Sequence, residues 1–226
     1  ANATLYARWT ANPYTVEYWN KAGTAKLSSD NGFEYDAARN LASKPVSGAS
    51  VGYTAVGWAD SANQSVRKYD FDSLQKNLAT AGVKKLYLAE TANAYSVSFD
   101  GNGGSGGEAG RTARATFDAA MPAISQDAPH RAGYAFKGWY DGADWRAAGV
   151  KQYYVAAGTS AQVWDKPSDA TLYAGWEALS YVLAYDAAGG ELAAGARGSY
   201  TIEDADFDLP SPTRYGYQFD GWDVSG

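Results

Sequence analysis

The stretch Gly133-Tyr134-Ala135-Phe136-Lys137-Gly138-Trp139 decides the fold, because the chain contains it in three versions. The others read Gly52-Tyr53-Thr54-Ala55-Val56-Gly57-Trp58 and Gly216-Tyr217-Gln218-Phe219-Asp220-Gly221-Trp222. The three versions begin at residues 52, 133 and 216, so the period is 81 and then 83 residues. A long motif that returns at a nearly constant period indicates tandem copies of one structural unit.

Two further patterns recur in the same order. One is a strand-like hexamer, found at 14–19, 95–100 and 181–186 as YTVEYW, YSVSFD and YVLAYD. The other is a pentamer, found at 5–9, 86–90 and 172–176 as LYARW, LYLAE and LYAGW. From the last residue of each pentamer to the first of the next hexamer is always five positions. The fixed order and spacing support the repeat.

These markers predict the domain organisation. Residues 1–12 would be the last strand of a preceding repeat and a linker, and residues 13–92 and 93–178 would be two complete modules. Residues 179–226 would be a module that lacks its final strand. We therefore expect the parent protein to continue in both directions.

The patterns predict a mainly β protein with little helix. In Tyr95-Ser96-Val97-Ser98-Phe99, large apolar residues alternate with polar ones at period two, which is typical of a half-buried strand. The best candidate for a helix is 72–82, with Asp72 as N-cap and Gly82 as the stop. A second helical turn is expected near 117–121.

The order of motifs resembles the Listeria–Bacteroides repeat, the B-repeat of internalin-type surface proteins. The unit at 93–178 carries it most completely, and the unit at 13–92 departs by Glu90 in place of the final Trp. The resemblance implies tandem β-grasp (ubiquitin-like) modules in secreted, cell-wall-associated bacterial proteins. It also implies a role as stalk or adhesive segment, usually without enzymatic activity.

The recurring pattern of glycines and aromatic rings has a structural interpretation. On a regular strand Tyr134 and Phe136 would share one face and Trp139 would lie on the other, so that one aromatic row fills a small core. Gly133 and Gly138 would permit a turn and a close backbone approach. The structural signature comprises Gly52, Tyr53, Gly57, Trp58, Gly133, Tyr134, Phe136, Gly138, Trp139, Gly216, Tyr217, Phe219, Gly221 and Trp222.

A binding interpretation remains for aromatic residues outside the signature. Trp145, Tyr153, Tyr154 and Trp164 lie in the connection 140–165, where exposed rings beside Asp141 and Asp144 could stack on a sugar. The alternative function is therefore a module that binds carbohydrate or a host protein through these rings.

Other classes of site have little support in the sequence. The chain has no cysteine, a single histidine (His130) and a net charge of −6, which argues against thiolate metal sites and nucleic-acid binding. The loop 100–105 lacks a third acidic ligand for calcium and is interpreted as a hairpin loop. We expect no catalytic residue, cofactor or metal, and no membrane insertion by these residues.

The leading functional prediction is a non-enzymatic stalk, spacer or adhesive segment on the bacterial cell surface, with signal and anchor outside these residues. A host protein or glycan is the expected partner. The orphan pentamer Leu5–Trp9 has the sequence of the strand that 179–226 lacks. A neighbouring molecule could donate it by strand addition, which would give head-to-tail chains.

Overall fold

The computed structural model describes residues 2–223 and divides the chain into two compact units. The first comprises Ala1–Ser96 with Arg114–Ala120 and Val163–Asp169, and the second comprises Val97–Ala113, Met121–Gln162 and Ala170–Gly226. The division differs from the expected module boundary at 92/93, since two short segments of the second repeat belong to the first unit. For one of them the reason is Phe117, whose ring packs edge-on against Tyr53 of the same unit.

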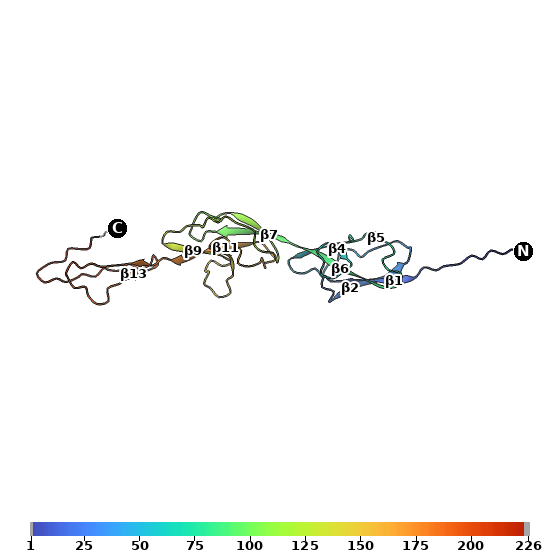
Figure 1. Cartoon of the computed structure of the whole chain (residues 1–226), viewed down its shortest axis with the longest axis horizontal. Coiled ribbons are helices and arrows are strands. Elements are labelled where there is room, and N and C mark those ends of the chain that lie inside the picture. Colours follow the sequence, from blue (N-terminus) through green and yellow to red (C-terminus); the bar gives the residue numbers. More distant parts are fainter. Residues whose placement is uncertain (1, 224–226) are drawn as a thin grey trace. The chain divides into compact units, whose positions relative to one another are not determined.

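Four strands of the first repeat form a mixed sheet in the order β2-β1-β6-β4 (Figure 1). β1 (Pro13–Trp19) runs parallel to β6 (Gly82–Ala92) and antiparallel to β2 (Lys26–Glu34), while β4 (Tyr53–Ala59) pairs antiparallel with β6. β3 (Arg39–Asn40) and β5 (Leu74–Gln75) form a separate short pair. The core of this sheet contains Tyr14, Val16, Tyr18, Phe33, Trp58, Leu86 and Leu88.

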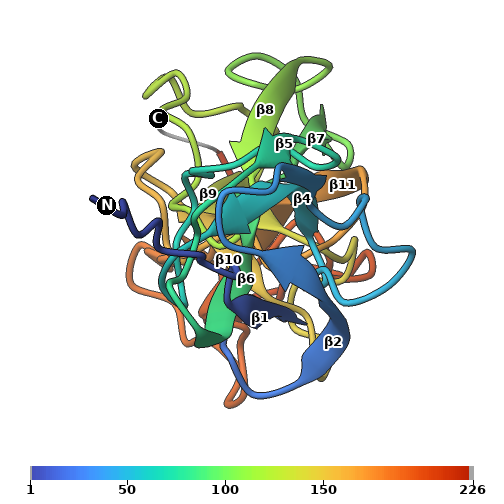
Figure 2. The same cartoon turned by 90° about the vertical axis from the view of Figure 1, so that its right-hand side faces the viewer.

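The second repeat forms a five-stranded sheet in the order β10-β9-β11-β7-β8. Figure 2 labels the strands of this sheet from another side. β11 (Ala170–Ala178) is parallel to β7 (Ala94–Asp100) and antiparallel to β9 (Tyr134–Tyr140). β10 (Gln152–Val155) and β8 (Thr112–Thr116) are the edge strands. Val97 and Phe99 are buried in alternation along β7, as the period-two pattern predicts.

The last strand of each complete repeat occupies the centre of its sheet. β6 lies between β1 and β4, and β11 lies between β7 and β9. Both are bonded on two sides, parallel to the first strand of the repeat and antiparallel to the strand that carries the Gly-Trp motif. The pentamer therefore belongs to the central strand of its sheet, although it comes last in the sequence of its repeat.

The third repeat contains much less regular structure. Within 180–223 the strands are β12 (Tyr181–Val182) and β13 (Ser199–Tyr200), which pair with each other. Leu183 and Tyr185, which correspond to the buried Val97 and Phe99, are only partly buried. The physical reason is that a first strand and a Gly-Trp strand bond to the central strand rather than to each other, and no central strand lies between them in these residues.

The segment 2–12 has no regular secondary structure, and Leu5 and Trp9 are 94% and 92% exposed. The sequence predicts a strand here, and the structure differs because a β-strand requires neighbours to satisfy its backbone groups.

The expected helix at 72–82 is wrong, because the structure has no helix in residues 2–223. Asn77, inside this range, adopts a left-handed backbone conformation with a φ of 57°, which a right-handed helix cannot include. The backbone N–H of Leu78 donates instead to the Tyr14 hydroxyl at 3.3 Å. Asp118, with φ of 56°, likewise interrupts the helical turn expected near 117–121. Tertiary contacts thus override the local helical pattern.

Candidate functional site

Trp176, the last residue of the pentamer in the second repeat, is enclosed by the loop after β7. Its indole N–H donates to the carbonyl oxygen of Gly101 at 2.9 Å. A β-carbon added to Gly104 would lie 2.2 Å from Cζ2 of the same ring. The Phe136 ring packs beside it, with 5.5 Å between centroids. Only 5% of Trp176 is exposed, so the glycine-rich loop serves to hold a tryptophan of the central strand.

The loop itself is fixed by its polar residues. Asp100 Oδ1 accepts a hydrogen bond from the backbone N–H of Asn102 at 2.8 Å, and Asn102 has a φ of 47°. The Asn102 amide donates to the Ala174 carbonyl at 3.0 Å on the central strand. Arg131 donates to the Asn102 carbonyl at 3.3 Å. The sequence correctly predicts a loop between two strands, but it does not indicate that this loop encloses Trp176.

The loop 100–105 was also considered as a site for calcium. The Asp100 carboxylate is engaged by the loop's own backbone. In the residues that the structure describes, no three His, Asp or Glu side chains are grouped so that they could hold a metal ion.

The Gly-Trp strand contains a bulge that the sequence does not reveal. The register of β9 against β11 shifts between the pairs Gly138–Gly175 and Phe136–Trp176. Phe136 and Trp139 consequently contact each other, with ring centroids 5.6 Å apart. The expectation that these two rings lie on opposite faces is therefore wrong, since an extra residue in one strand resets the alternation.

Gly138 is required at this bulge. Its φ is 126°, and a β-carbon would lie 2.2 Å from the Tyr154 carbonyl oxygen. Gly57 occupies the same place in the first repeat, where a β-carbon would lie 2.4 Å from the Tyr69 carbonyl oxygen. The close backbone approach predicted for this glycine is confirmed, and Trp139, which follows it, is buried.

The glycine that opens the motif contacts a residue of the following repeat. In the first unit, a β-carbon on Gly52 would lie 2.4 Å from the Phe117 ring, and the Tyr53 hydroxyl donates to Asp118 at 2.9 Å. That hydrogen bond, together with partial burial, raises the pKa of the Tyr53 phenol. In the second unit, a β-carbon on Gly133 would lie 2.8 Å from Ile202.

The chain directly after each pentamer strengthens this contact. Asn93 donates its backbone N–H to the Gly52 carbonyl at 2.9 Å, and Leu179 donates to the Gly133 carbonyl at 2.8 Å. Sequence reasoning missed Phe117 and Ile202. The signal that could have found them is the shared pattern of threonine, an apolar residue and an acid at 116–118 and 201–203.

The four rings considered for sugar stacking are not available as a group. Tyr153, Tyr154 and Trp164 have no exposed surface. Tyr154 donates its hydroxyl to the Pro122 carbonyl at 2.8 Å, and burial raises the pKa of its phenol. The expectation of exposed rings in the 140–165 connection is thus corrected for three residues, whose apolar area stabilises the interior.

Trp145, the fourth ring, is partly exposed but is covered on several sides. Its N–H donates to the Trp176 carbonyl at 2.9 Å, and its ring lies 5.4 Å from that of Tyr140. The Arg146 guanidinium lies 4.4 Å from the ring centroid. A sugar would have to displace Arg146 to reach this face.

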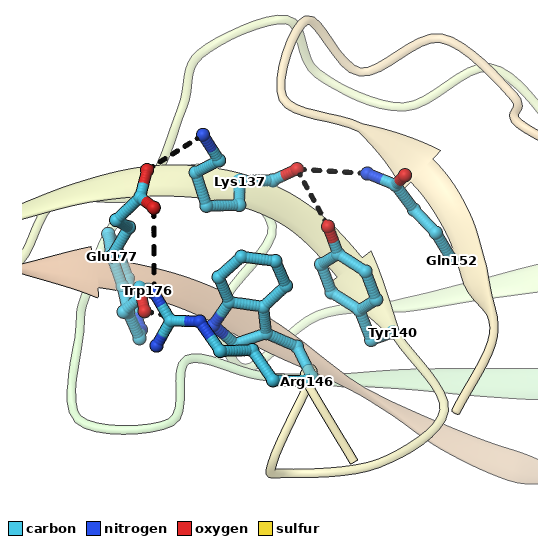
Figure 3. A network of polar contacts seen from close by, with 7 residues as sticks. Lys137, Tyr140, Arg146, Gln152, Trp176 and Glu177 are labelled. Atoms are coloured by element: carbon cyan, nitrogen blue, oxygen red, sulfur yellow. Dashed lines mark hydrogen bonds and ion pairs between the residues drawn. The ribbon is translucent and has the colours of Figure 1, made fainter. Parts of the chain in front are cut away.

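A network of polar contacts joins Lys137 and Tyr140 of β9 and Glu177 of β11 to Arg146 and Gln152 (Figure 3). Glu177 accepts from Lys137 at 2.9 Å and lies 3.5 Å from Arg146. The hydrogen bond from Lys137 holds the pKa of Glu177 below its usual value. Tyr140 and Gln152 both donate to the Lys137 carbonyl, at 3.2 and 2.9 Å (Figure 3). These exposed pairs fix the surface of the sheet and contribute little individually to stability.

The single histidine lies next to a serine. Ser105 Oγ is 3.4 Å from Nε2 of His130, because the backbones of these residues form an isolated antiparallel bridge. The contact is therefore a consequence of the loop that closes over Trp176.

Comparison with known families agrees with the repeated geometry. The model of the Listeria-Bacteroides repeat domain matches residues 14–86, 95–175 and 181–225. The chain belongs to this family. The resemblance inferred from the motifs is thus confirmed over three repeats.

Two curated bacterial proteins are similar to this repeat chain. A "Putative membrane protein" of Evansella cellulosilytica is 24% identical over 222 residues, covering 97% of this chain and 29% of that protein. A "Putative Gly-rich membrane protein" of the same organism is 25% identical over 232 residues, covering 97% and 22%. The chain thus spans less than a third of the length of these relatives. No solved structure shows significant similarity to it.

For residues 2–223, the structure contains no helix with the length and apolar character needed to cross a bilayer.

Proposed function

We propose that this chain is a non-enzymatic stalk or spacer segment of a bacterial cell-surface protein. The observation that carries the proposal is the recurrent contact between successive repeats, Gly52 with Phe117 and Gly133 with Ile202. A contact repeated at equivalent positions is what an array requires if each unit interacts mainly with its neighbours. The family model matches three successive segments of this chain, and this tandem arrangement supports the same role.

We also propose that each complete repeat is a β-grasp-type module. The support is topological. In the order β2-β1-β6-β4, two central parallel strands are flanked by antiparallel neighbours. In the second sheet the parallel strands β7 and β11 are also adjacent and interior, and β10 is an additional edge strand. The modules would differ from ubiquitin-like domains in lacking a helix across the sheet within the described residues.

The use of the aromatic residues favours a structural role over carbohydrate binding. Trp58, Trp139 and Trp176 are buried, and the rings of the 140–165 connection are buried or covered by Arg146. The glycines at which an added β-carbon would be closest to other atoms lie against carbonyl oxygens and aromatic rings of this chain. The proposal includes a location outside the cell, attachment to the wall and adhesion to a host protein or glycan. The two relatives are named as putative membrane proteins, which is compatible with it.

Small-angle X-ray scattering on chains with one, two or three additional copies of residues 93–178 tests the stalk proposal. A stalk predicts that the maximum dimension increases by a constant increment per copy. Growth with only the cube root of mass would contradict it. Parallel screening of the unmodified chain on a glycan array tests the alternative, and saturable binding abolished by Trp145→Ala would favour that alternative.

A further inference from the structure

We propose that each complete repeat of this chain functions as a tension-bearing element, in which a force along the chain loads a pair of parallel strands in shear. The inference rests on the proposed stalk function, since a segment that connects two attached ends is pulled whenever those ends move apart. It also goes further than that function, because a chain could act as a spacer without resisting force.

The first and last strands of each complete repeat are neighbours and run in the same direction. β1 pairs with β6 over six residue pairs, and β7 pairs with β11 over four. In both cases the chain enters the repeat at the beginning of one strand of the pair. It leaves the repeat at the end of the other strand, so the points of entry and exit lie at opposite ends of the pair.

This topology decides how a pulling force acts on the hydrogen bonds. A force on the chain before β1 is directed towards the beginning of that strand, and a force on the chain after β6 is directed towards the end of its neighbour. The two strands are therefore driven to slide along each other. Because the hydrogen bonds of a parallel pair are evenly spaced, they share this load and have to fail together. Antiparallel neighbours in the same place would open from one end, one bond at a time.

The last strand of each repeat is also held by a second neighbour. β6 pairs with β1 as far as Tyr87 and with β4 from Tyr87 onwards. β11 pairs with β7 as far as Tyr173 and with β9 from Tyr173 onwards. The two tyrosines are equivalent, because each is the second residue of its pentamer. A force that extracts the last strand therefore has to break its pairing along its whole length.

The inner face of each parallel pair is shielded from water. In the first repeat, Val16 and Tyr18 of β1 and Leu86 of β6 are buried. In the second, Phe99 of β7 and Leu172 of β11 are buried in the same way. Water competes for backbone groups that it can reach, so a covered pair keeps its hydrogen bonds until the strands slide.

Side chains join β1 to both of its neighbours in the first repeat. Glu17 of β1 accepts a hydrogen bond from Lys26 of β2 at 3.0 Å and one from the Trp19 indole N–H at 3.1 Å. Lys85 of β6 lies 4.9 Å from the centroid of the Trp19 ring. The strand that receives the load first is thus attached to the strand on either side of it.

The chain contains no cysteine, so two introduced cysteines can define the direction of a force. Each is coupled to a DNA handle, and optical tweezers pull between them in the full 226-residue chain. Asn12→Cys with Thr91→Cys loads β1 and β6 in shear. Asn12→Cys with Val83→Cys is the matched control, because Val83 lies opposite Thr15 near the beginning of both strands and the same pair is then peeled from one end. Positions 12, 83 and 91 are exposed.

We expect the first repeat to unfold at a force at least about twofold higher in shear than in peeling, because six pairs are loaded together rather than in turn. In shear the repeat should open in a single event that releases residues 12–91, which span at most about 260–290 Å when extended. Equal unfolding forces in the two directions would overturn the proposal. Stepwise release of β6 at low force would overturn it as well.

The second repeat offers the same comparison. Ser96→Cys with Leu179→Cys loads β7 and β11 in shear, and Ser96→Cys with Ser168→Cys peels them from their beginnings. We expect the higher force again in shear. Urea unfolding without force should give the same midpoint for the two variants of each repeat, since both keep the same strands. The difference in unfolding force then reports the direction of pulling alone.

Failure of this proposal is distinguishable from failure of the stalk proposal. Scattering measures how the length of the chain increases with repeat number in the absence of force, whereas the tweezers compare two directions of force within one repeat. A repeat that unfolds equally easily in both directions can still be part of a spacer. A chain whose length does not increase regularly can still contain repeats that resist shear.

Discussion

Gly104 and Trp176 are in direct contact: a β-carbon on Gly104 would lie 2.2 Å from Cζ2 of the indole and 2.9 Å from the His130 carbonyl oxygen. The loop and the central strand have therefore been matched to each other. In the first repeat the pentamer ends in Glu90 instead of tryptophan. Gly23, which stands at the position of Gly104, lies against another ring there, because an added β-carbon would be 2.9 Å from Cε1 of Tyr87.

Gly104→Ala should destabilise the second unit by about 1–3 kcal/mol, because overpacking forces the indole or the loop to move. Gly198→Ala is the control, since a β-carbon there meets no atom within 4 Å. Denaturant unfolding followed by fluorescence measures both. Adding Trp176→Leu to Gly104→Ala should make the two effects strongly non-additive. Additive effects would show that the contact does not limit this position.

Glu90→Ala should destabilise the first unit by about 2–3 kcal/mol, because it removes a buried side chain and the acceptor of a backbone hydrogen bond. Glu90 is completely buried, and its Oε1 accepts from the Ser50 backbone N–H at 2.9 Å. Glu90→Gln keeps that acceptor and should lose less stability than Glu90→Ala. Thermal unfolding measures both variants against exposed Glu34→Ala, and equal losses for Glu90→Gln and Glu90→Ala would contradict the prediction.

Phe117→Ala should destabilise the first unit by about 1–2 kcal/mol, because a half-buried ring that covers Gly52 and Tyr53 is lost. Faster hydrogen exchange is expected at Asn93, whose N–H donates to the Gly52 carbonyl. Ile202→Ala, at the equivalent contact of the second unit, should leave exchange at Asn93 unchanged. If Ile202→Ala accelerated it equally, the effect would be global rather than a property of this contact.

Acidification should destabilise the first unit through Asp60. Partial burial opposes ionisation, but hydrogen bonds from Lys68 and Lys84 outweigh it and lower the pKa of Asp60 below the ordinary value of 3.8. A carboxyl with a lowered folded-state pKa contributes stability that is fully present above its unfolded value and is lost as the pH falls through the folded value.

Asp60→Asn should therefore reduce the dependence of unfolding free energy on pH below about pH 4. Lys84→Gln, which removes a partner 2.7 Å from Asp60, should reduce it in the same direction. Urea unfolding between pH 2 and pH 6 provides the measurement. An unchanged slope in both variants would show that the ion pairs do not persist in solution.

The sequence by itself determined the repeat, the alternation of the strands and the family. These depend on local patterns, such as Val97 and Phe99 on one face of β7 and the glycines at each Gly-Trp motif, where the backbone leaves no space for a β-carbon. The sequence was misleading at 72–82, where apolar spacing suited a helix, and at 140–165, where rings with no evident partner suggested an exposed surface.

Only the tertiary structure decided where the pentamer lies. Its strand is last in the repeat but central in the sheet, and no property of Leu172–Trp176 alone specifies two neighbours far apart in the sequence. The same holds for the contact of Gly133 with Ile202. Strand order and inter-repeat contacts are long-range pairings, and their energies depend on segments that come together only when the chain folds.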